Sequence, residues 1–291
     1  MPRTADAALA PAKVNLTLRV TGRRADGRHE LDSLVVFAGV GDVLSVRPAG
    51  EYVLEVDGPF AAGVPTGPEN IVMRAARALR PQGGGYVRLT KNLPHGGGIG
   101  GGTSDAAAAL RLLGRQWGTA VPGRDALMAL GADLPVCMHA PAPAWMTGCG
   151  ERVARVPDLP DAWLVLAAPR AGASTAEVFA AHAALGVPFE DFAGPPPAAL
   201  EVADLALWAV SVGNDLAVAA ATVVPEIAEV LAALRAAPGV LGAGMSGSGS
   251  TCWGLCGTEG AARAAAGAVA AADRWCVAAP MLRPGDSLAA A

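Results

Sequence analysis

Alternating polar and apolar residues predict a strand close to the start of the chain. Between Lys13 and Arg19, every second residue is apolar. Since successive side chains of a strand point to opposite faces, this pattern predicts a half-buried strand over residues 10–19. Lys13 and Asn15 fall on the same face of that strand, so we expect their polar side chains to lie side by side.

Further apolar patterns predict the other elements. Short apolar or alternating runs predict strands over residues 31–37, 43–47, 52–56, 86–90, 163–168, 240–245 and 251–256. Apolar residues at helical spacing predict helices over residues 70–79, 124–130, 174–184, 215–221, 226–236 and 259–272. Strands and helices occur in runs instead of alternating strictly, which favours an α+β fold over a doubly wound parallel sheet.

Length and composition limit the class of protein. At about 150 residues per domain, 291 residues suggest two domains, which we place at residues 1–155 and 156–291. Hydrophobic residues make up 52% of the chain and charged residues 16%, which excludes a disordered chain. The net charge of -4 argues against a bulk nucleic-acid binder.

The apolar runs and the cysteines indicate in which cellular compartment the protein is expected. The longest apolar runs are Ala-rich, are interrupted by charge and stay well short of the roughly 20 residues that span a bilayer. The first ten residues lack an apolar stretch long enough for a secretory signal. Five scattered cysteines argue against a disulfide framework, and neither CxxC nor HExxH spacing occurs. We therefore expect a cytoplasmic protein with no membrane partner and no structural metal site.

A glycine-rich segment is the strongest chemical signal in the chain. Six glycines fall within residues 96–102, and the Ala/Leu run behind them predicts a helix with Thr103, Ser104 or Asp105 as its N-cap. Glycine lets backbone amides approach a ligand closely, and a helix N-terminus adds free N–H groups and a positive dipole end. The segment therefore indicates an anion site suited to phosphates, with a merely flexible turn as the alternative.

Other phosphate-loop and catalytic motifs fit less well. No Gly-Lys dipeptide occurs, so the GxxxxGK[ST] phosphate loop is absent, and so is a GxSxG nucleophile elbow. A GxGxxG match begins at Gly96, but in so dense a run of glycines that match is weak evidence. The acidic residue about 20 positions on, Asp125, falls in a predicted helix instead of at a strand end. A dinucleotide-dependent oxidoreductase is therefore the least favoured alternative.

Two lysines, one aspartate and a second glycine-rich turn complete the candidates. Lys13 and Lys91 are the two lysines of a chain that otherwise uses arginine, and both lie close to these segments. Asp133 precedes an apolar segment, where an acid is either a helix cap or a working carboxylate. Residues 246–250 form either a plain hairpin turn or a second closure over the same ligand.

Several segments carry a resemblance to a known family. PAKVNL at residues 11–16, LPHGGGIGGGTSDAAAAL at 93–110 and GAGMSGSGS at 242–250 resemble the three motifs of the GHMP kinase superfamily, in the same order. DGRHEL, LGADLPV and STAEVF narrow the resemblance to the branch that phosphorylates a cytidine diphosphate-linked methylerythritol in non-mevalonate isoprenoid synthesis. The resemblance covers roughly residues 9–256.

The resemblance implies an ATP-dependent small-molecule kinase that uses Mg²⁺. Its fold would have an N-terminal α/β lobe and a C-terminal ferredoxin-like lobe, with the active site in the cleft between them. The protein would be a monomer or a weak homodimer. Two alternatives stay open: another GHMP kinase, acting on a sugar, homoserine or a mevalonate-like alcohol, and a non-catalytic nucleotide-binding protein on the same fold. DGRHEL argues against the first, and the presence of both Lys13 and Asp133 argues against the second.

The resemblance also implies which residues bind the nucleotide. The glycine-rich segment would wrap the ATP phosphates through Pro94, Gly96, Gly97, Gly98, Ile99, Gly100, Gly101, Gly102, Thr103 and Ser104. Asn70 and Lys91 would lie near the nucleoside. The second turn would close the phosphate site through Ser246, Gly247 and Ser248. The hydroxyl of Thr103 or Ser104 is a candidate Mg²⁺ ligand.

The catalytic and substrate-binding residues are implied in the same way. Asp133 would be the catalytic carboxylate, and Lys13 would keep it ionised and hold the reacting hydroxyl. Substrate contacts would come from Asn15, Arg28, His29, Thr175 and Phe179. His29 would contact the cytosine. The family usually has a tyrosine that stacks on the cytosine where this chain has Arg28, whose guanidinium plane can also stack on a base.

Overall fold

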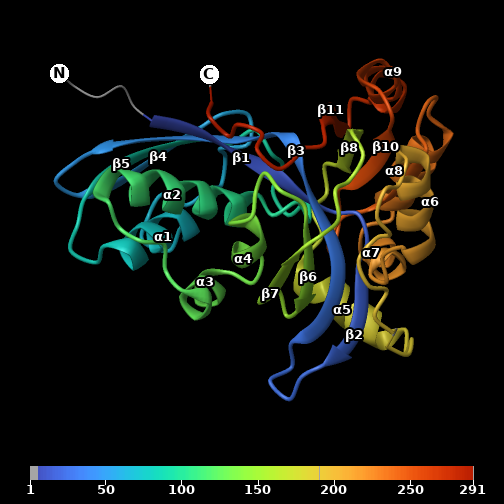
Figure 1. Ribbon diagram of the computed structural model, residues 1–291, viewed down its shortest axis with the longest axis horizontal. Helices are drawn as coiled ribbons and strands as arrows, with labels where there is room; N and C mark the ends of the chain where they lie inside the picture. Colours follow the sequence, from blue (N-terminus) through green and yellow to red (C-terminus); the bar gives the residue numbers. More distant parts are fainter. Residues whose placement is uncertain (1–5, 190, 291) are drawn as a thin grey trace.

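The computed structural model describes residues 6–189 and 191–290, and within them the chain forms two lobes side by side (Figure 1). In this part of the chain, the first lobe holds a seven-stranded sheet in the order β4-β5-β3-β6-β7, with β1 and β2 also paired to β3. Its strands are β1 (Asp6–Asn15), β2 (Arg19–Arg23), β3 (His29–Pro48), β4 (Tyr52–Asp57), β5 (Gly85–Thr90), β6 (Ala144–Gly148) and β7 (Arg152–Arg155). The second lobe holds a four-stranded sheet in the order β11-β8-β10-β9. Its strands are β8 (Trp163–Pro169), β9 (Gly242–Met245), β10 (Cys252–Cys256) and β11 (Arg274–Pro280).

The helices divide between the lobes in chain order (Figure 1). The first lobe carries α1 (Ile71–Leu79), α2 (Gly101–Trp117), α3 (Arg124–Leu130) and α4 (Leu134–Cys137). The second carries α5 (Thr175–Ala184), α6 (Val202–Val212), α7 (Ala217–Val223), α8 (Glu226–Ala236) and α9 (Glu259–Val269). The predicted two-lobed α+β architecture is confirmed. Over the described residues, no helix combines the length and apolar character that a membrane crossing requires.

The long strand β3 corrects one prediction. Residues 31–37 and 43–47 were expected as two strands separated by glycines, but they belong to one continuous strand. A Cβ at Gly41 would lie 2.0 Å from the carbonyl oxygen of Ala10, next to a register shift in β1. The glycine therefore permits a close approach of two strands at a bulge and does not form a turn.

β1 is buried on both faces, so the expectation of a half-buried strand is wrong. Lys13 and Asn15 are only 3% and 1% exposed. Helix α2 contacts β1, with Ala10 in the core of the first lobe, while Val14 joins an apolar cluster shared with the second lobe. The polar positions of this strand therefore face a buried polar network instead of solvent.

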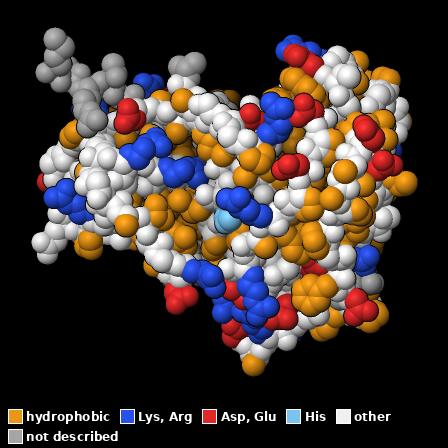
Figure 2. All heavy atoms as spheres, viewed as in Figure 1, with side chains coloured by type: hydrophobic (Ala, Val, Ile, Leu, Met, Phe, Trp, Pro, Cys, Tyr) orange, Lys and Arg blue, Asp and Glu red, His pale blue; other side chains and the backbone are white. Residues whose placement is uncertain are grey.

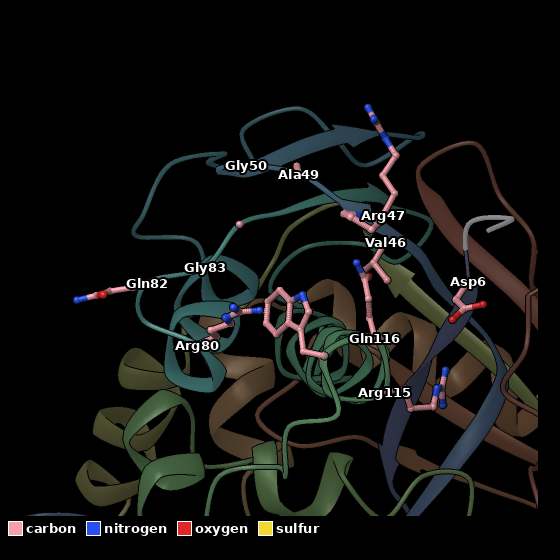
Figure 3. A pocket seen from close by; sticks show the side chains of 13 residues that line it. Asp6, Val46, Arg47, Ala49, Gly50, Arg80, Gln82, Gly83, Arg115 and Gln116 are labelled. Carbon is pink, nitrogen blue, oxygen red and sulfur yellow. The ribbon is translucent and has the colours of Figure 1, made fainter. Parts of the chain in front are cut away.

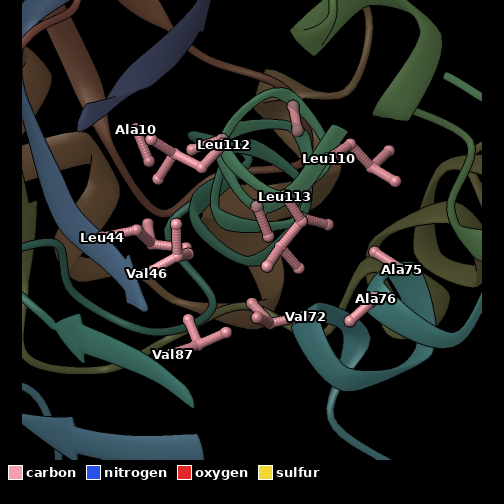
Figure 4. Close-up of a cluster of buried hydrophobic side chains, with 14 of the residues drawn as sticks. Ala10, Leu44, Val46, Val72, Ala75, Ala76, Val87, Leu110, Leu112 and Leu113 are labelled. Atoms are coloured by element: carbon pink, nitrogen blue, oxygen red, sulfur yellow. The ribbon is translucent and has the colours of Figure 1, made fainter. Parts of the chain in front are cut away.

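The core of the first lobe lies between its sheet and helices α1 and α2 (Figure 4). Leu44 and Val87 of the sheet, Val72 of α1 and Leu113 of α2 are buried in it. Burying each such side chain contributes about 1.5–3 kcal/mol relative to leaving it exposed. The alanine run at residues 106–109 is fully buried, and its small side chains let α2 approach α1 and β1 closely.

The start of α2 differs from the prediction. Its N-cap is Gly100, whose φ of 64° is a left-handed conformation that suits glycine. The sequence pattern placed the cap at Thr103, Ser104 or Asp105, which is wrong. The helix begins earlier because those side chains have other partners. The Ser104 Oγ, for example, donates to the carbonyl of Pro11 at 2.7 Å.

An apolar contact joins the two lobes. Val14 and Leu34 of the first sheet pack with Leu164 and Trp253 of the second in one buried cluster. The opposite face of the second sheet packs against α7, α8 and α9. Because this core is continuous between the sheets, it holds β1 and the turn after β9 in fixed relative positions.

The sequence analysis did not predict six elements: β2, α4, β6, β7, α6 and β11. Helix α6 reads VADLALWAVSV, and Leu207 on its outer face is 69% exposed. With apolar residues on both its inner and outer faces, no polar stripe marked the helix. β6 and β7 have only five and four residues, too few to show a period.

Candidate active site

A cavity of about 460 Å³ opens at the border of the two lobes. It lies where β1, the starts of α2, α4 and α5, and the turn after β9 converge. Most of the predicted site residues line it: Lys13, Asn15, Lys91, Pro94, residues 96–103, Asp133, Thr175, Phe179, Gly247 and Ser248. Its volume is in the usual range for small-molecule sites.

The two glycine-rich turns interlock at this cavity. Gly98 has a φ of 68°, and a Cβ on it would lie 2.4 Å from the carbonyl oxygen of Ser246. The Ser246 Oγ donates to the Gly98 carbonyl at 3.0 Å, and the Thr251 N–H donates to the Gly97 carbonyl at 2.9 Å. Only glycine fits so close a contact between two backbones. The second turn is therefore not a plain hairpin turn, because it packs on the first turn and Gly247 lines the same cavity.

Lys13 and Asp133 form an ion pair in the cavity wall. The Lys13 Nζ lies 3.1 Å from Asp133 Oδ2, and the two side chains are 4% and 35% exposed. Asp133 occupies the N-cap position of α4, but its side chain makes no capping hydrogen bond. Of the two readings that the sequence allowed, a helix cap is therefore excluded by geometry. The carboxylate keeps one side toward the cavity, where it can accept a proton or a hydrogen bond.

A buried polar chain holds Lys13 in place. Its Nζ donates to Asn15 Oδ1 at 2.7 Å, and Asn15 Nδ2 donates to Ser33 Oγ at 2.7 Å. The backbone N–H of Asn15 donates to Ser246 Oγ at 3.0 Å. Each polar atom of Asn15 in this chain is satisfied, which fixes the lysine rotamer. Sequence reasoning missed Ser33, because nothing distinguishes a serine within an apolar strand.

Lys91 lies in a second, almost fully buried cluster at the edge of the cavity. Its Nζ donates to Asp105 Oδ2 at 2.8 Å and also to Asp42, and the exposed fractions of the three side chains lie between 0% and 5%. Asp42 in turn accepts hydrogen bonds from the N–H groups of Asn92 and Leu93. The cluster braces the segment before the glycine-rich loop against the first turn of α2. Neither aspartate was predicted as a partner of Lys91; the signal that was present is the rarity of lysine in this chain.

Burial and the neighbouring charges shift the pKa values of Lys91 and Asp105 in this cluster. Burial alone would lower the pKa of Lys91, but the attraction of Asp105 and Asp42 outweighs it and raises that pKa above its ordinary value. Burial raises the pKa of Asp105 well above its ordinary value, although Lys91 opposes the shift. The Oδ1 of Asp105 has no hydrogen-bond partner, whereas Asp42 accepts two backbone bonds.

A smaller cavity of about 250 Å³ adjoins the first and shares Lys91, His95 and Gly102 with it. Asn70 lines this smaller cavity and not the larger one. Its Oδ1 accepts the Val72 N–H at 2.8 Å, which caps α1 at its N-terminus. The predicted nucleoside residues Asn70 and Lys91 are thus brought together beside the phosphate loop.

Thr103 and Ser104, the two candidates for a Mg²⁺ ligand, have different environments. The Thr103 side chain lines the larger cavity, and its hydroxyl donates to the Gly100 carbonyl at 2.9 Å, which leaves oxygen lone pairs for a ligand. Ser104 is fully buried and does not line either cavity. The described residues contain no cluster of three or more His, Cys, Asp or Glu side chains suited to a metal. The Thr103 hydroxyl fits Mg²⁺, which takes few protein ligands and binds mainly through substrate phosphates.

The far end of the larger cavity is aromatic and apolar. His29 stacks on Phe179 with the ring centroids 4.4 Å apart and the planes 14° from parallel. The hydroxyls of Thr175 and Ser248 are hydrogen-bonded at 2.9 Å. Burial lowers the pKa of His29, and the nearby Arg23 and His182 lower it further. The imidazole is therefore neutral at pH 7 and has an aromatic face suited to a planar ligand group.

Two predicted substrate residues, Arg28 and His29, do not line the cavity, although His29 stacks on Phe179, which does. The Arg28 side chain is 56% exposed and pairs with Asp26 at 2.6 Å. Charged side chains of both signs gather over this β2–β3 hairpin, at the lower edge of the molecule in Figure 2. The guanidinium is held by its neighbour two residues back instead of facing a base.

Several lining residues were missed by sequence reasoning because they are apolar. They are Leu18, Leu31, Met146, Cys149 and Leu216. Each lies in or next to a strand or helix whose apolar pattern is typical of core, and apolar lining and apolar core have the same sequence signal. Together they give the cavity a wall that complements an organic substrate more than a bare ion.

Family models match both lobes. The GHMP kinases N terminal domain matches residues 70–146, and the GHMP kinases C terminal domain matches residues 198–273. The first match contains the glycine-rich loop and Asp133, and the second contains the turn after β9.

Curated relatives are similar over most of the chain. A 4-diphosphocytidyl-2-C-methyl-D-erythritol kinase from Parvibaculum lavamentivorans is 51% identical over 267 residues, which cover 88% of this chain and 91% of that protein. A protein of the same name from Ruegeria pomeroyi is 48% identical over 87% of this chain and 89% of its own length.

Solved structures of GHMP-type kinases have the same fold as this chain. A crystal structure of 4-(cytidine 5'-diphospho)-2C-methyl-D-erythritol kinase superposes with a TM-score of 0.76 at 36% identity and covers 95% of this chain and 99% of that chain. A homoserine kinase from Cytophaga hutchinsonii has a TM-score of 0.65 at 17% identity over 97% of this chain and 96% of its own, a likeness of fold alone.

Proposed function

The chain belongs to the GHMP kinase family, and we propose that it phosphorylates 4-diphosphocytidyl-2-C-methyl-D-erythritol at its 2-hydroxyl with ATP. The products are the 2-phosphate and ADP, in a step of non-mevalonate isoprenoid synthesis. Two relatives with that substrate in their names, at 51% and 48% identity, support the assignment over other GHMP kinases. We infer a cytoplasmic location, which the use of ATP and the free cysteines of the described residues support.

The Lys13–Asp133 pair carries the proposal, because it stands in the cavity wall between the phosphate loop and the aromatic end. The substrate hydroxyl oxygen forms a bond to the γ-phosphorus of ATP while the bond from that phosphorus to ADP breaks. The proton of the hydroxyl passes to the Asp133 carboxylate. Lys13 balances the negative charge that gathers around the transferred group, and Asn15 holds Lys13 in position.

The nucleotide lies along the glycine-rich loop. Its phosphates meet the free N–H groups and positive dipole end at the start of α2, and its nucleoside occupies the smaller cavity beside Asn70 and Lys91. Thr103 would hold the Mg²⁺ ion together with the phosphates, and the ion would neutralise phosphate charge. The Ser246–Ser248 turn closes the phosphate site from the second lobe.

The substrate lies at the aromatic end. His29 and Phe179 bind the cytosine by its planar face, and Thr175 orients the substrate from α5. The apolar wall keeps water away from the transferred phosphoryl group, which favours transfer to the alcohol over hydrolysis.

The test is ADP release by the purified protein with Mg-ATP. Four alcohols are compared: 4-diphosphocytidyl-2-C-methyl-D-erythritol, galactose, homoserine and mevalonate. We expect turnover with the cytidyl substrate alone. Turnover only with another alcohol would keep the kinase activity and overturn the substrate. ATP binding without any turnover would favour a non-catalytic protein.

A further inference from the structure

A second cavity lies in the first lobe, away from the proposed active site (Figure 3). Its volume is about 770 Å³, larger than the cavity between the lobes. Its walls come from the end of β3, the turn into β4, and the C-terminal ends of α1 and α2. None of the predicted catalytic or binding residues lines it.

The cavity is basic. Arg80 and Arg115 both line it, and neither side chain forms an ion pair within the described part of the chain. Asp6 is the one acidic residue in its lining. A third arginine, Arg47, lies 3.9 Å above the ring of Tyr86, and in Figure 3 its side chain turns away from the hollow. Two arginines without carboxylate partners are thus left at one concave site.

An unpaired amide lies in the same wall. The Gln116 Nε2 is buried and has no hydrogen-bond acceptor among the described residues. Buried donors are nearly always satisfied in native proteins, so this group lacks a partner that a ligand oxygen would supply. Basic residues at helix C-termini are also favoured by the helix dipole, which accounts for the charge of Arg115 in the last turn of α2. The helix dipole does not account for the cavity itself or for the unpaired side-chain amide of Gln116.

We propose that this cavity binds a small organic phosphate. Arginine binds phosphate through paired, directional N–H groups, and Gln116 adds a third donor. Val46 and Trp117 give the cavity apolar surface beside these donors, and the volume is that of sites for organic ligands instead of bare ions. The Arg80 guanidinium carbon lies over the ring of Trp117, 6.0 Å from the ring centroid, and both residues line the cavity.

This site is separate from the nucleotide site but built on the same two helices. α1 begins at Asn70 beside the nucleoside cavity and ends at Arg80 in the second cavity. α2 likewise begins in the phosphate loop and ends at Trp117. At about 1.5 Å per residue, α2 separates the sites by about 25 Å, so one ligand cannot occupy both.

Calorimetric titration of phenyl phosphate into the full-length protein tests the proposal. The proposed nucleotide site is first filled with a non-hydrolysable ATP analogue, whose binding is measured on its own. We expect one further site, which the Arg80→Gln/Arg115→Gln double variant weakens at least tenfold. Gln116→Leu, similar in size but without the amide, should weaken it about threefold to tenfold. Arg124→Gln, which removes an exposed arginine outside both cavities, should leave it unchanged.

Three outcomes would overturn the proposal. The first is no binding of phenyl phosphate, and the second is equal binding by the wild type and the double variant. The third is equal affinity for inorganic phosphate and phenyl phosphate, which would show that the cavity does not recognise the organic group. Far-UV circular dichroism checks that each variant folds, and the single Arg115→Gln variant serves if the double variant does not. Failure of the ATP analogue to bind would count against the proposed function alone, because the comparison of wild type and cavity variants still decides the second site.

Discussion

The two lysines of this chain make similar ion pairs in opposite surroundings. Lys13 meets Asp133, whose side chain is 35% exposed at the wall of the inter-lobe cavity. Lys91 meets Asp42 and Asp105, and no side chain of that cluster is more than 5% exposed. The first pair can contact a ligand in the cavity, whereas in the second each carboxylate is almost fully buried and contacts the lysine.

The difference shows how accessibility separates the pair that we propose to be catalytic from one with a structural role. An almost fully buried ion pair affects the stability of the fold mainly when one partner is removed, since the other charge is then buried without compensation. An open pair can lose a partner at lower cost in stability, because water or substrate replaces it. Residue types alone did not make this distinction, since both lysines stood beside functional segments in the sequence.

The Lys91 cluster should have the larger effect on stability. Lys91→Met leaves two buried carboxylates unpaired, and we expect it to lower the free energy of unfolding by about 3–5 kcal/mol. Urea unfolding followed by circular dichroism measures this. Lys13→Met is the matched control and should cost less than half as much, because Asp133 can be solvated from the cavity. Equal losses of unfolding free energy in the two variants would contradict the idea that burial distinguishes the two ion pairs.

The open pair should have the larger effect on turnover. Asp133→Asn removes the proton acceptor, so we expect kcat to fall by about 10² or more while ATP binding stays within about threefold of wild type. Steady-state ADP release and calorimetry of ATP binding measure the two quantities. Asp26→Asn, in the exposed hairpin, is the control and should leave both unchanged. Near-normal turnover of Asp133→Asn would remove this carboxylate from the mechanism.

His29 should make substrate binding dependent on pH. Its pKa lies below the ordinary value of 6.5, chiefly through burial, so the ring stays neutral as pH falls to 6.5. Protonation below that point costs folding free energy, because the unfolded chain takes up the proton more readily. If the neutral ring binds cytosine, KM rises by up to about tenfold per pH unit below the folded pKa.

His29→Gln should flatten that KM profile without moving the profile of kcat. Measuring KM between pH 5 and 8 in both proteins decides the matter. An inflection above pH 6.5, or one that persists in the variant, would assign the dependence to another group.

The smallest effect is expected at Arg28, next to His29. Its side chain pairs with Asp26 in solvent, so Arg28→Ala should change the KM of the cytidyl substrate by less than about threefold. Phe179→Leu, which removes the ring stacked on His29, should raise that KM by about tenfold. A larger effect at Arg28 than at Phe179 would mean that the arginine turns inward when substrate binds.

Local signals in the sequence predicted much of the molecule. The helix after Asn70, the glycine-rich loop, the second glycine turn and the α+β class all follow from backbone conformations or apolar periods that neighbouring residues impose. The limits of such signals are seen at α6, where apolar residues face solvent, and at Gly41, where a glycine marks a strand contact instead of a turn. In both cases the deciding neighbour lies far away along the chain.

By itself, then, the sequence predicted candidate residues for the chemistry, because glycine-rich loops, lysines and acids are recognised by type and local spacing. The tertiary structure alone decided which of them share a site. Lys91 meets Asp42 across 49 positions, and Asn15 meets Ser246 across 231. It also decided that Asp133 is partly exposed while Asp105 is almost fully buried, and that Arg28 faces solvent while His29 stacks on Phe179. Burial and orientation depend on packing between distant segments, and no local pattern encodes them.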